Sequence, residues 1–158
     1  MHELKPLTPL GGKTPKIDSF DGLRISECPE WALASVTARR GRAIDAAAAV
    51  EKLIGTALPD IAMSATAGPF TAFWSGPQQW MIEAPHDSHE DLAAQLKAAV
   101  GETASITEQT DGWCRFDLEG ARCHDVLERL CNANTRAMER GHAGSIHHAL
   151  TVAATSAI

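Results

Sequence analysis

Apolar and polar residues alternate in six short segments of the chain, and this period of two predicts β-strands. The expected strands form three pairs, residues 23–27 with 31–37, 70–74 with 80–83, and 103–107 with 113–119. Within 31–37, Ala32, Ala34 and Val36 share one face, where small side chains predict a closely packed helix. The last strand, 113–119, places Cys114, Phe116 and Leu118 opposite Arg115, Asp117 and Glu119, which is typical of a half-buried strand.

Between these pairs, apolar residues recur with the helical period. The first predicted helix runs from about Asp45 to Gly55, a glycine placed as a C-terminal cap. A second follows Ser88, whose spacing to Asp91 predicts a capping box, and others follow Gly120 and begin near Ser145. Their apolar positions are Ala43, Ala46, Ala47, Val50, Leu53 and Ile54, then Leu92, Leu96, Ala99 and Val100, then Cys123, Val126, Leu127, Leu130 and Cys131, then Ile146, Ala149, Leu150 and Ala153.

Strands that pair locally, with helices between the pairs, predict an α+β fold in which helices cover a mostly antiparallel sheet. We assign residues 22–158 to a single domain of this kind. Residues 1–21 contain three prolines and Gly11-Gly12 without periodic apolar residues, which predicts an extended tail that is neither helix nor strand. Leucines in such a tail would face water in an isolated chain. We therefore expect the tail to dock on a partner subunit through Leu7, Pro9 and Leu10.

Charge and composition exclude several function classes. The net charge of −6 and the isoelectric point of about 5.6 oppose binding to nucleic acid, whose phosphates require basic surfaces. No run approaches the roughly 18 apolar residues of a membrane span, and the N-terminus lacks the apolar core of a signal peptide. We therefore expect a cytoplasmic protein. The four cysteines form no CxxC pair, which favours reduced thiols, three of them on predicted apolar faces.

No set of residues predicts catalysis or cofactor binding in this chain. His147 and His148 are neighbours on a predicted helix and point in different directions, so no metal site is expected. Neither a nucleophile elbow nor a G-x-G-x-x-G loop is present. Ordinary surface roles explain the candidate acid–base carboxylates, which are Glu83, Asp111, Asp117 and Glu119.

Tryptophans are the other residues that suggest a binding surface. Trp74 and Trp80 flank a Gly-Pro turn, and Trp113 follows Asp111-Gly112. Such side chains pack in a core or an interface, and they also stack on flat ligands such as a pterin. We predict partner contacts for all three.

Several motifs, in this order and spacing, resemble the gamma subunit of heterotetrameric sarcosine oxidase. They are Pro6-Leu7-Thr8-Pro9-Leu10-Gly11-Gly12, Ser26-Glu27-Cys28-Pro29-Glu30-Trp31-Ala32-Leu33-Ala34-Ser35-Val36, Trp74-Ser75-Gly76-Pro77-Gln78-Gln79-Trp80, Asp111-Gly112-Trp113, Gly120-Ala121-Arg122, Leu127-Glu128-Arg129-Leu130-Cys131 and Ser145-Ile146-His147-His148-Ala149-Leu150. The resemblance covers nearly the whole chain. It implies a fold similar to part of the folate-binding T-protein of glycine cleavage.

The resemblance also implies a function for the assembled complex. Such a complex demethylates sarcosine oxidatively and passes the one-carbon unit to tetrahydrofolate, giving 5,10-methylene-tetrahydrofolate and hydrogen peroxide. FAD, FMN, NAD, tetrahydrofolate and zinc would belong to the alpha, beta and delta subunits. The gamma subunit would stabilise their assembly without catalytic residues. A related N-methyl amino acid dehydrogenase with a gamma-like subunit is the alternative of the same class.

One departure from this family lies near the C-terminus. The family continues after Arg140-Gly141-His142-Ala143 with a returning strand pair, whereas Gly144-Ser145 follows directly here. A sheet without those strands would have an open edge for a partner to cover. Two other classes stay open, a stand-alone folate-binding or aminomethyltransferase-like protein and an adaptor without a redox partner. The first is disfavoured because the T-protein is a much longer chain.

Overall fold

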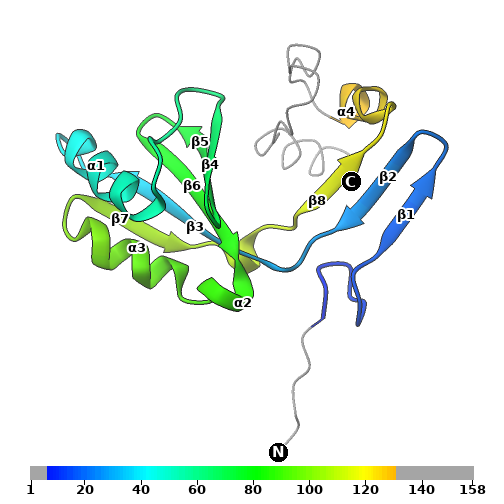
Figure 1. Cartoon of the computed structure of the whole chain (residues 1–158), viewed down its shortest axis with the longest axis horizontal. Helices are drawn as coiled ribbons and strands as arrows, with labels where there is room; N and C mark the ends of the chain where they lie inside the picture. The colour runs from blue at the N-terminus through cyan, green and yellow to red at the C-terminus, as the bar shows by residue number, and fades with distance from the viewer. Residues whose placement is uncertain (1–6, 131–158) are drawn as a thin grey trace, which may run out of the picture. The chain divides into compact units, whose positions relative to one another are not determined.

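The computed structural model describes residues 7–130, which divide into two compact units (Figure 1). Unit 1 comprises the described residues up to Pro29 and from Cys114 onward, and unit 2 is Glu30–Trp113. Each unit has its own antiparallel sheet, with several helices in unit 2 and helix α4 among the described residues of unit 1, so the predicted α+β class is confirmed. The sequence predicted one domain over residues 22–158, without this division. The predicted helix near Ser145 lies outside the described residues.

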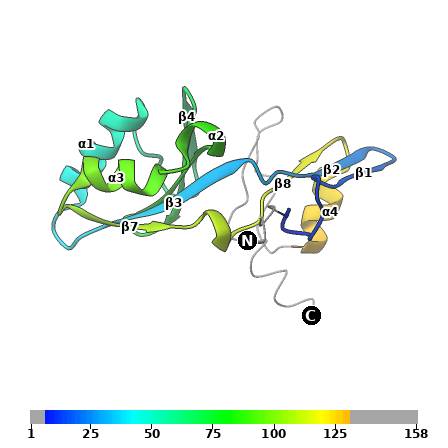
Figure 2. The ribbon, with the colours of Figure 1, turned by 90° about the horizontal axis from the view of Figure 1, so that it is seen from below.

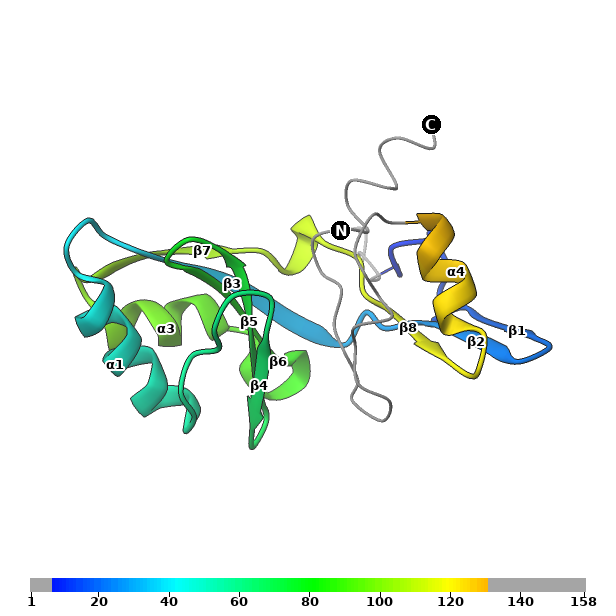
Figure 3. The same ribbon diagram turned by 90° about the horizontal axis from the view of Figure 1, so that it is seen from above.

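Unit 2 is a five-stranded sheet with its main helices on one face. The strand order is β4-β5-β6-β3-β7, and every neighbouring pair is antiparallel. The two longer helices, α1 and α3, contact each other and strand β3 (Figures 2 and 3). In chain order the elements are β3 (Trp31–Ala38), α1 (Ala43–Ile54), β4 (Ser64–Ala67), β5 (Phe70–Gly76), β6 (Gln79–Pro85), α2 (His86–His89), α3 (Leu92–Val100), β7 (Ala104–Glu108) and the 3₁₀ turn η1 (Thr110–Gly112).

The core of unit 2 lies between this sheet and the two helices. Ala32, Ala34 and Val36 of β3 are buried, as their shared face predicted. The helices contribute one stripe each, and the buried members are Ala46, Val50, Ile54, Leu92, Leu96 and Val100. Burying a leucine or valine side chain of this kind contributes about 1.5–3 kcal/mol. Ala99, which we placed on the α3 stripe, is exposed instead.

Both longer unit 2 helices end where their glycines predicted, α1 before Gly55 and α3 before Gly101, whose amide donates to the Lys97 carbonyl at 3.0 Å. Gly55 ends α1 in the left-handed conformation, with φ 80°, and its amide donates to the Glu51 carbonyl at 2.9 Å. The capping box predicted at Ser88 is wrong. Asp91, not Ser88, precedes α3, and the Ser88 hydroxyl contacts the Pro85 carbonyl at 3.3 Å. The short helix α2 occupies the positions that the capping box required, because it begins directly after Pro85.

Unit 1 is a three-stranded sheet, in the order β1-β2-β8, with helix α4 beside it. Its elements are β1 (Ile17–Phe20), β2 (Leu23–Glu27), β8 (Phe116–Glu119) and α4 (Cys123–Leu130). The prediction that residues up to 21 form no strand is wrong for β1, which pairs with β2 across the two-residue loop Asp21-Gly22. Asp-Gly between two apolar segments is a strong hairpin signal, and the neighbouring prolines masked it.

Strand β8 is shorter than the segment 113–119 that the sequence predicted. Its ladder with β2 begins at Phe116, opposite Glu27, and one more hydrogen bond joins the Cys28 amide to the Arg115 carbonyl at 2.9 Å. Pro29 comes two residues after the end of β2 and has no amide hydrogen to continue the ladder. The alternation of apolar and polar residues along 113–119 does not show where the neighbouring strand stops donating hydrogen bonds.

Two backbone segments of unit 1 approach each other closely at Gly120 and Gly22. A Cβ atom at Gly120 would lie 2.4 Å from the Gly22 carbonyl oxygen, and the φ of Gly120 is 123°. The same carbonyl accepts a hydrogen bond from the Arg122 amide at 3.0 Å. Glycine at position 120 therefore allows the β1–β2 hairpin to contact the start of α4.

Candidate functional site

Residues 8–12 form a hydrogen-bonded turn, which we call the 8–12 turn. The Gly11 amide donates to the Thr8 carbonyl at 2.7 Å, and the Thr8 amide donates to the Gly12 carbonyl at 2.9 Å. The Thr8 hydroxyl accepts from the Gly12 amide at 3.1 Å. Proline at the second position and glycine at the fourth are the residues that such a turn favours. The segment that we predicted as an extended tail is therefore locally folded.

The Glu27 carboxylate ties this turn to the sheet of unit 1. Its Oε1 accepts from the Leu10 amide at 2.8 Å, and its Oε2 accepts from the Lys16 amide at 2.9 Å. The Glu27 amide in turn donates to the Lys16 carbonyl at 2.9 Å. Glu27 is only 4 % exposed, although it is charged. One buried side chain on β2 thus holds the backbone at both ends of segment 10–16.

The environment of Glu27 favours its ionised form. Burial raises the pKa of Glu27. Hydrogen bonds from the Lys16 and Leu10 amides and from the Thr8 hydroxyl, together with the Lys16 charge, lower the pKa by more than burial raises it. The net result is a pKa below the ordinary glutamate value. Hydrogen bonding to a carboxylate has this effect because it stabilises the charged form. The turn is therefore held by an anion at neutral pH.

The predicted interface residues of this segment are exposed. Leu7 is 63 % exposed and Leu10 is 58 % exposed, and Pro9 is exposed between them. The backbone of Leu10 is fixed by Glu27 while its side chain faces solvent. Their role in contacting a partner remains a prediction.

The three tryptophans for which we predicted partner contacts lie in unit 2, and all are half-buried. Trp74 and Trp80 are cross-strand partners on β5 and β6. The Trp80 indole donates to the Pro59 carbonyl at 3.0 Å and packs against the core. Trp113 follows η1 and is not part of a strand. The structure thus brings Trp74 and Trp80 together and gives Trp80 a packing role, whereas the predicted partner contacts remain predictions.

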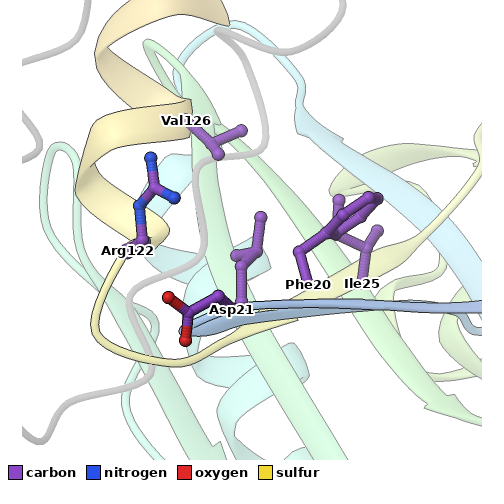
Figure 4. Close-up of a pocket in the computed structure, with 6 residues that line it drawn as sticks. Phe20, Asp21, Ile25, Arg122 and Val126 are labelled. Carbon is purple, nitrogen blue, oxygen red and sulfur yellow. The ribbon is translucent and has the colours of Figure 1, made fainter.

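Unit 1 also contains an apolar pocket of about 340 Å³. One side of the pocket is the β1–β2 hairpin, which contributes Phe20, Asp21, Leu23 and Ile25. The other side is formed by Arg122, directly before α4, and by Val126 of α4 (Figure 4). Arg122 forms an ion pair with Asp125 at 3.1 Å, so its charge is partly neutralised. The sequence did not predict this pocket, because its residues are far apart along the chain.

Unit 2 exposes three further large apolar side chains, which are Ile44, Ile61 and Met63. Ile44 lies on α1 and is 86 % exposed. Ile61 and Met63 flank Ala62, a non-glycine residue with φ 62°. The Met63 amide donates to the Asp60 carbonyl at 3.0 Å, which closes this turn. Unit 2 therefore presents apolar side chains to solvent as unit 1 does.

The carboxylates considered as acid–base candidates do not converge. Asp117 pairs with Arg115 at 3.0 Å, and Glu119 pairs with Arg24 at 3.3 Å. Asp111 is exposed in η1. The surface role predicted for Glu83 is wrong, because Glu83 is buried on β6 between Leu33 and Thr71. Side chains alternate along β6, so Glu83 lies on the sheet face opposite Ile82 and Ala84, which the helices cover. The sequence pattern alone did not show whether the Glu83 face is buried.

Metal and thiol chemistry find no support in residues 7–130. Within that range, no three histidine, cysteine, aspartate or glutamate side chains gather as a metal site would require. Cys28 is buried, Cys123 is half-buried and Cys114 is exposed. Burial raises the pKa of the Cys123 thiol, and the charge of Glu119 adds to this, so it is not an activated thiolate. The apolar environment predicted for Cys114 is wrong, because β8 begins two residues later.

Thr8 and Glu27 are the site residues that the sequence did not predict. The signal for Glu27 is its place at the end of the alternating set Leu23, Ile25 and Glu27, where a charge occurs on an otherwise apolar strand face. The signal for Thr8 is the Thr-Pro-Leu-Gly pattern of a turn. Neither signal shows that Thr8 and Glu27 lie close together, because the two residues are far apart in the sequence.

These observations define an α+β protein whose described residues present an ordered turn with exposed leucines and include no group of three or more potential metal-ligating side chains. No protein-family model matches the sequence, and no curated protein matches it. Among solved structures, a chain of the heterotetrameric sarcosine oxidase from Corynebacterium sp. U-96, in complex with pyrrole 2-carboxylate, is similar in fold. The TM-score is 0.59 at 22 % identity, over 71 % of this chain and 57 % of that chain. The similarity therefore concerns the fold, and this chain spans little more than half of its neighbour. No helix within residues 7–130 is long and apolar enough to cross a membrane.

Proposed function

We propose that this chain is the non-catalytic gamma-type subunit of a heterotetrameric sarcosine oxidase. The complex would demethylate sarcosine oxidatively, transfer the one-carbon unit to tetrahydrofolate and release hydrogen peroxide. The observation that carries the proposal is the similarity in fold to a chain of such an oxidase, over 71 % of this chain. The sequence motifs that resemble the gamma subunit point to the same complex independently of that fold comparison.

Two properties of the described residues support a role in assembly. They contain no group of three or more potential metal-ligating side chains. They also present exposed Leu10 from a turn with a hydrogen-bonded backbone, and exposed Leu7 directly before it, which together form an apolar surface that a partner would bury. The flavins, NAD, tetrahydrofolate and zinc would then be held by the alpha, beta and delta subunits, which are the proposed partners.

Co-expression of the full chain with candidate alpha, beta and delta subunits from the same genome tests this proposal. We expect one four-chain species by native mass spectrometry, with flavin absorbance in the complex and none in the isolated chain. A chain that stays alone in the presence of all three partners would refute the proposal. Sarcosine and N-methylglutamate as substrates of the assembled complex would separate an oxidase of sarcosine from a related N-methyl amino acid dehydrogenase.

Calorimetry of the isolated chain with tetrahydrofolate separates the proposal from a stand-alone folate-binding protein. We expect no heat of binding at micromolar concentration, because the folate site would lie in another subunit. Tight binding by the isolated chain would favour the folate-binding alternative.

A further inference from the structure

The 8–12 turn combines a fixed backbone with exposed apolar side chains. Its backbone is fixed by hydrogen bonds within residues 8–12 and by one from the Leu10 amide to the buried Glu27 carboxylate, which also accepts from the Lys16 amide beyond the turn. The side chains of Leu10, within the turn, and of Leu7, directly before it, are nevertheless among the most exposed apolar residues of unit 1. Surface turns that only connect elements are usually polar, so the fixed backbone and the exposed leucines call for a common explanation.

Burying a carboxylate has a desolvation cost that its hydrogen bonds must offset. Glu27 directs both oxygens at backbone amides of one loop, at Leu10 and Lys16. It therefore fixes the shape of the loop and its attachment to strand β2. A binding segment that is already ordered loses less conformational entropy when it docks, which strengthens association.

We propose that Glu27 is a positioning residue that preforms the 8–12 turn, so that Leu7 and Leu10 insert into an apolar recess of a non-identical partner subunit. This inference rests on the proposed function and adds to it the docking segment and its mechanism. The partner is a different polypeptide, because a second copy carries the same net charge of −6 and is repelled. Residues 7–17 carry Lys13 and Lys16 without any carboxylate, and Lys16 pairs with Asp18 at 3.0 Å, so Lys13 is the cation that this segment presents to acidic side chains at the rim of the recess.

The first test removes the leucine side chains from the full chain and leaves the Glu27 hydrogen bonds in place. We expect Leu7→Ser/Leu10→Ser to weaken binding to the partner subunits about a hundredfold or more, because two buried leucines contribute to association. Hydrogen exchange of residues 8–16 should stay as slow as in the wild type, since no hydrogen bond of the turn is removed. The matched control, Leu7→Met/Leu10→Met, keeps apolar volume and should assemble normally.

The second test removes the Glu27 carboxylate and leaves the leucines in place. We expect Glu27→Gln to speed hydrogen exchange at residues 8–16, because an amide NH₂ group would face a backbone donor in place of a carboxylate oxygen. Binding should weaken about tenfold, with the loss mainly in the association rate, because the turn must order before it docks. A merely structural role for Glu27 would change the unfolding midpoint without this specific change in rate.

The outcomes separate this inference from the proposed function. Failure of the wild-type chain to assemble would refute the proposed function and this inference with it. Normal assembly of Leu7→Ser/Leu10→Ser, in a system where the wild type assembles, would overturn the inference alone. Sedimentation of the isolated chain would also overturn it if a dimer forms and the double serine variant abolishes that dimer, since the occupant would then be a second copy.

Discussion

The Leu10 amide lies 2.8 Å from the Glu27 Oε1 atom, although 17 positions separate the two residues along the chain. This bond fixes the backbone of a residue whose side chain remains 58 % exposed. A leucine held in solvent by a buried carboxylate is understandable if its side chain has a partner outside the unit. The relationship therefore connects the fold of unit 1 to the assembly role that we propose for the chain.

Acidification is expected to weaken unit 1 through Glu27. The hydrogen bonds to its carboxylate hold the pKa of Glu27 below the ordinary value of 4.5, so the folded state favours the ionised form. The resulting stabilisation is complete above the ordinary pKa and is lost as the pH falls through the lowered one. Thermal unfolding between about pH 6 and pH 3 should show a smaller decline of Tm for Glu27→Gln than for the wild type.

A matched surface variant controls for the loss of one carboxylate elsewhere in unit 1. Glu119→Gln removes an exposed carboxylate paired with Arg24 at 3.3 Å, and such pairs contribute little. We expect its pH dependence to match the wild type. Identical curves for Glu27→Gln and the wild type would mean that the carboxylate does not hold the turn.

Substitution of Gly120 should destabilise unit 1. A Cβ atom there would lie 2.4 Å from the Gly22 carbonyl oxygen, and the φ of 123° is unfavourable for any residue with a side chain. Because the close contact and the unfavourable φ both belong to the backbone, a change of side-chain rotamer cannot relieve either of them. We expect Gly120→Ala to lower the free energy of unfolding by about 1–3 kcal/mol in urea titrations.

Gly41→Ala is the control for this substitution. Gly41 has φ 76°, but a Cβ atom there would meet no other atom within 4 Å, so this position lacks the steric conflict. We expect a loss of about 1 kcal/mol, from backbone strain alone. Equal losses at both glycines would contradict the close approach at Gly120.

The elements of unit 2 were largely predictable because its core is built from local periodicity. The residues that bury β3, α1 and α3 recur at the strand and helix periods, so the inner face of each element follows from its own residues. Strand β4 was missed because Ser64–Ala67 contains only small and polar residues. Glu83 was misassigned because burial of a polar strand face depends on what covers it, and the sequence of a single strand does not contain that information.

Unit 1 and the candidate site were less predictable because their decisive contacts are distant in sequence. Pro9 and Pro15 indicated a tail, whereas Glu27 converts the same segment into a fixed turn. Leu7, Pro9 and Leu10 were identified from their apolar character in a proline-rich segment. What fixes them could not be predicted, because no local pattern pairs a carboxylate with amides this far away.

Truncation of a buried side chain of unit 2 should cost far more stability than truncation of an exposed one. Leu96 is fully buried on α3, so Leu96→Ala should cost about 2–5 kcal/mol through lost burial and the cavity left behind. Ile44→Ala removes a similar side chain that is 86 % exposed, and it should change stability by less than about 0.5 kcal/mol. Urea unfolding followed by circular dichroism measures both, and a large loss for Ile44→Ala would show that this side chain is not free in solution.

Replacing Trp80 tests whether its indole is a structural anchor of unit 2. Trp80→Phe removes the N–H that donates to the buried Pro59 carbonyl at 3.0 Å, and that oxygen would lose this partner. We expect a loss of about 1–3 kcal/mol in urea titrations, from the hydrogen bond and the reduced packing. Trp74→Phe keeps the Trp80 bond and should cost less, while any weakening of subunit assembly by this variant would support Trp74 as a partner contact. Equal destabilisation by the two variants would contradict the anchoring role of Trp80, because only one of them removes the bond to the loop at Pro59.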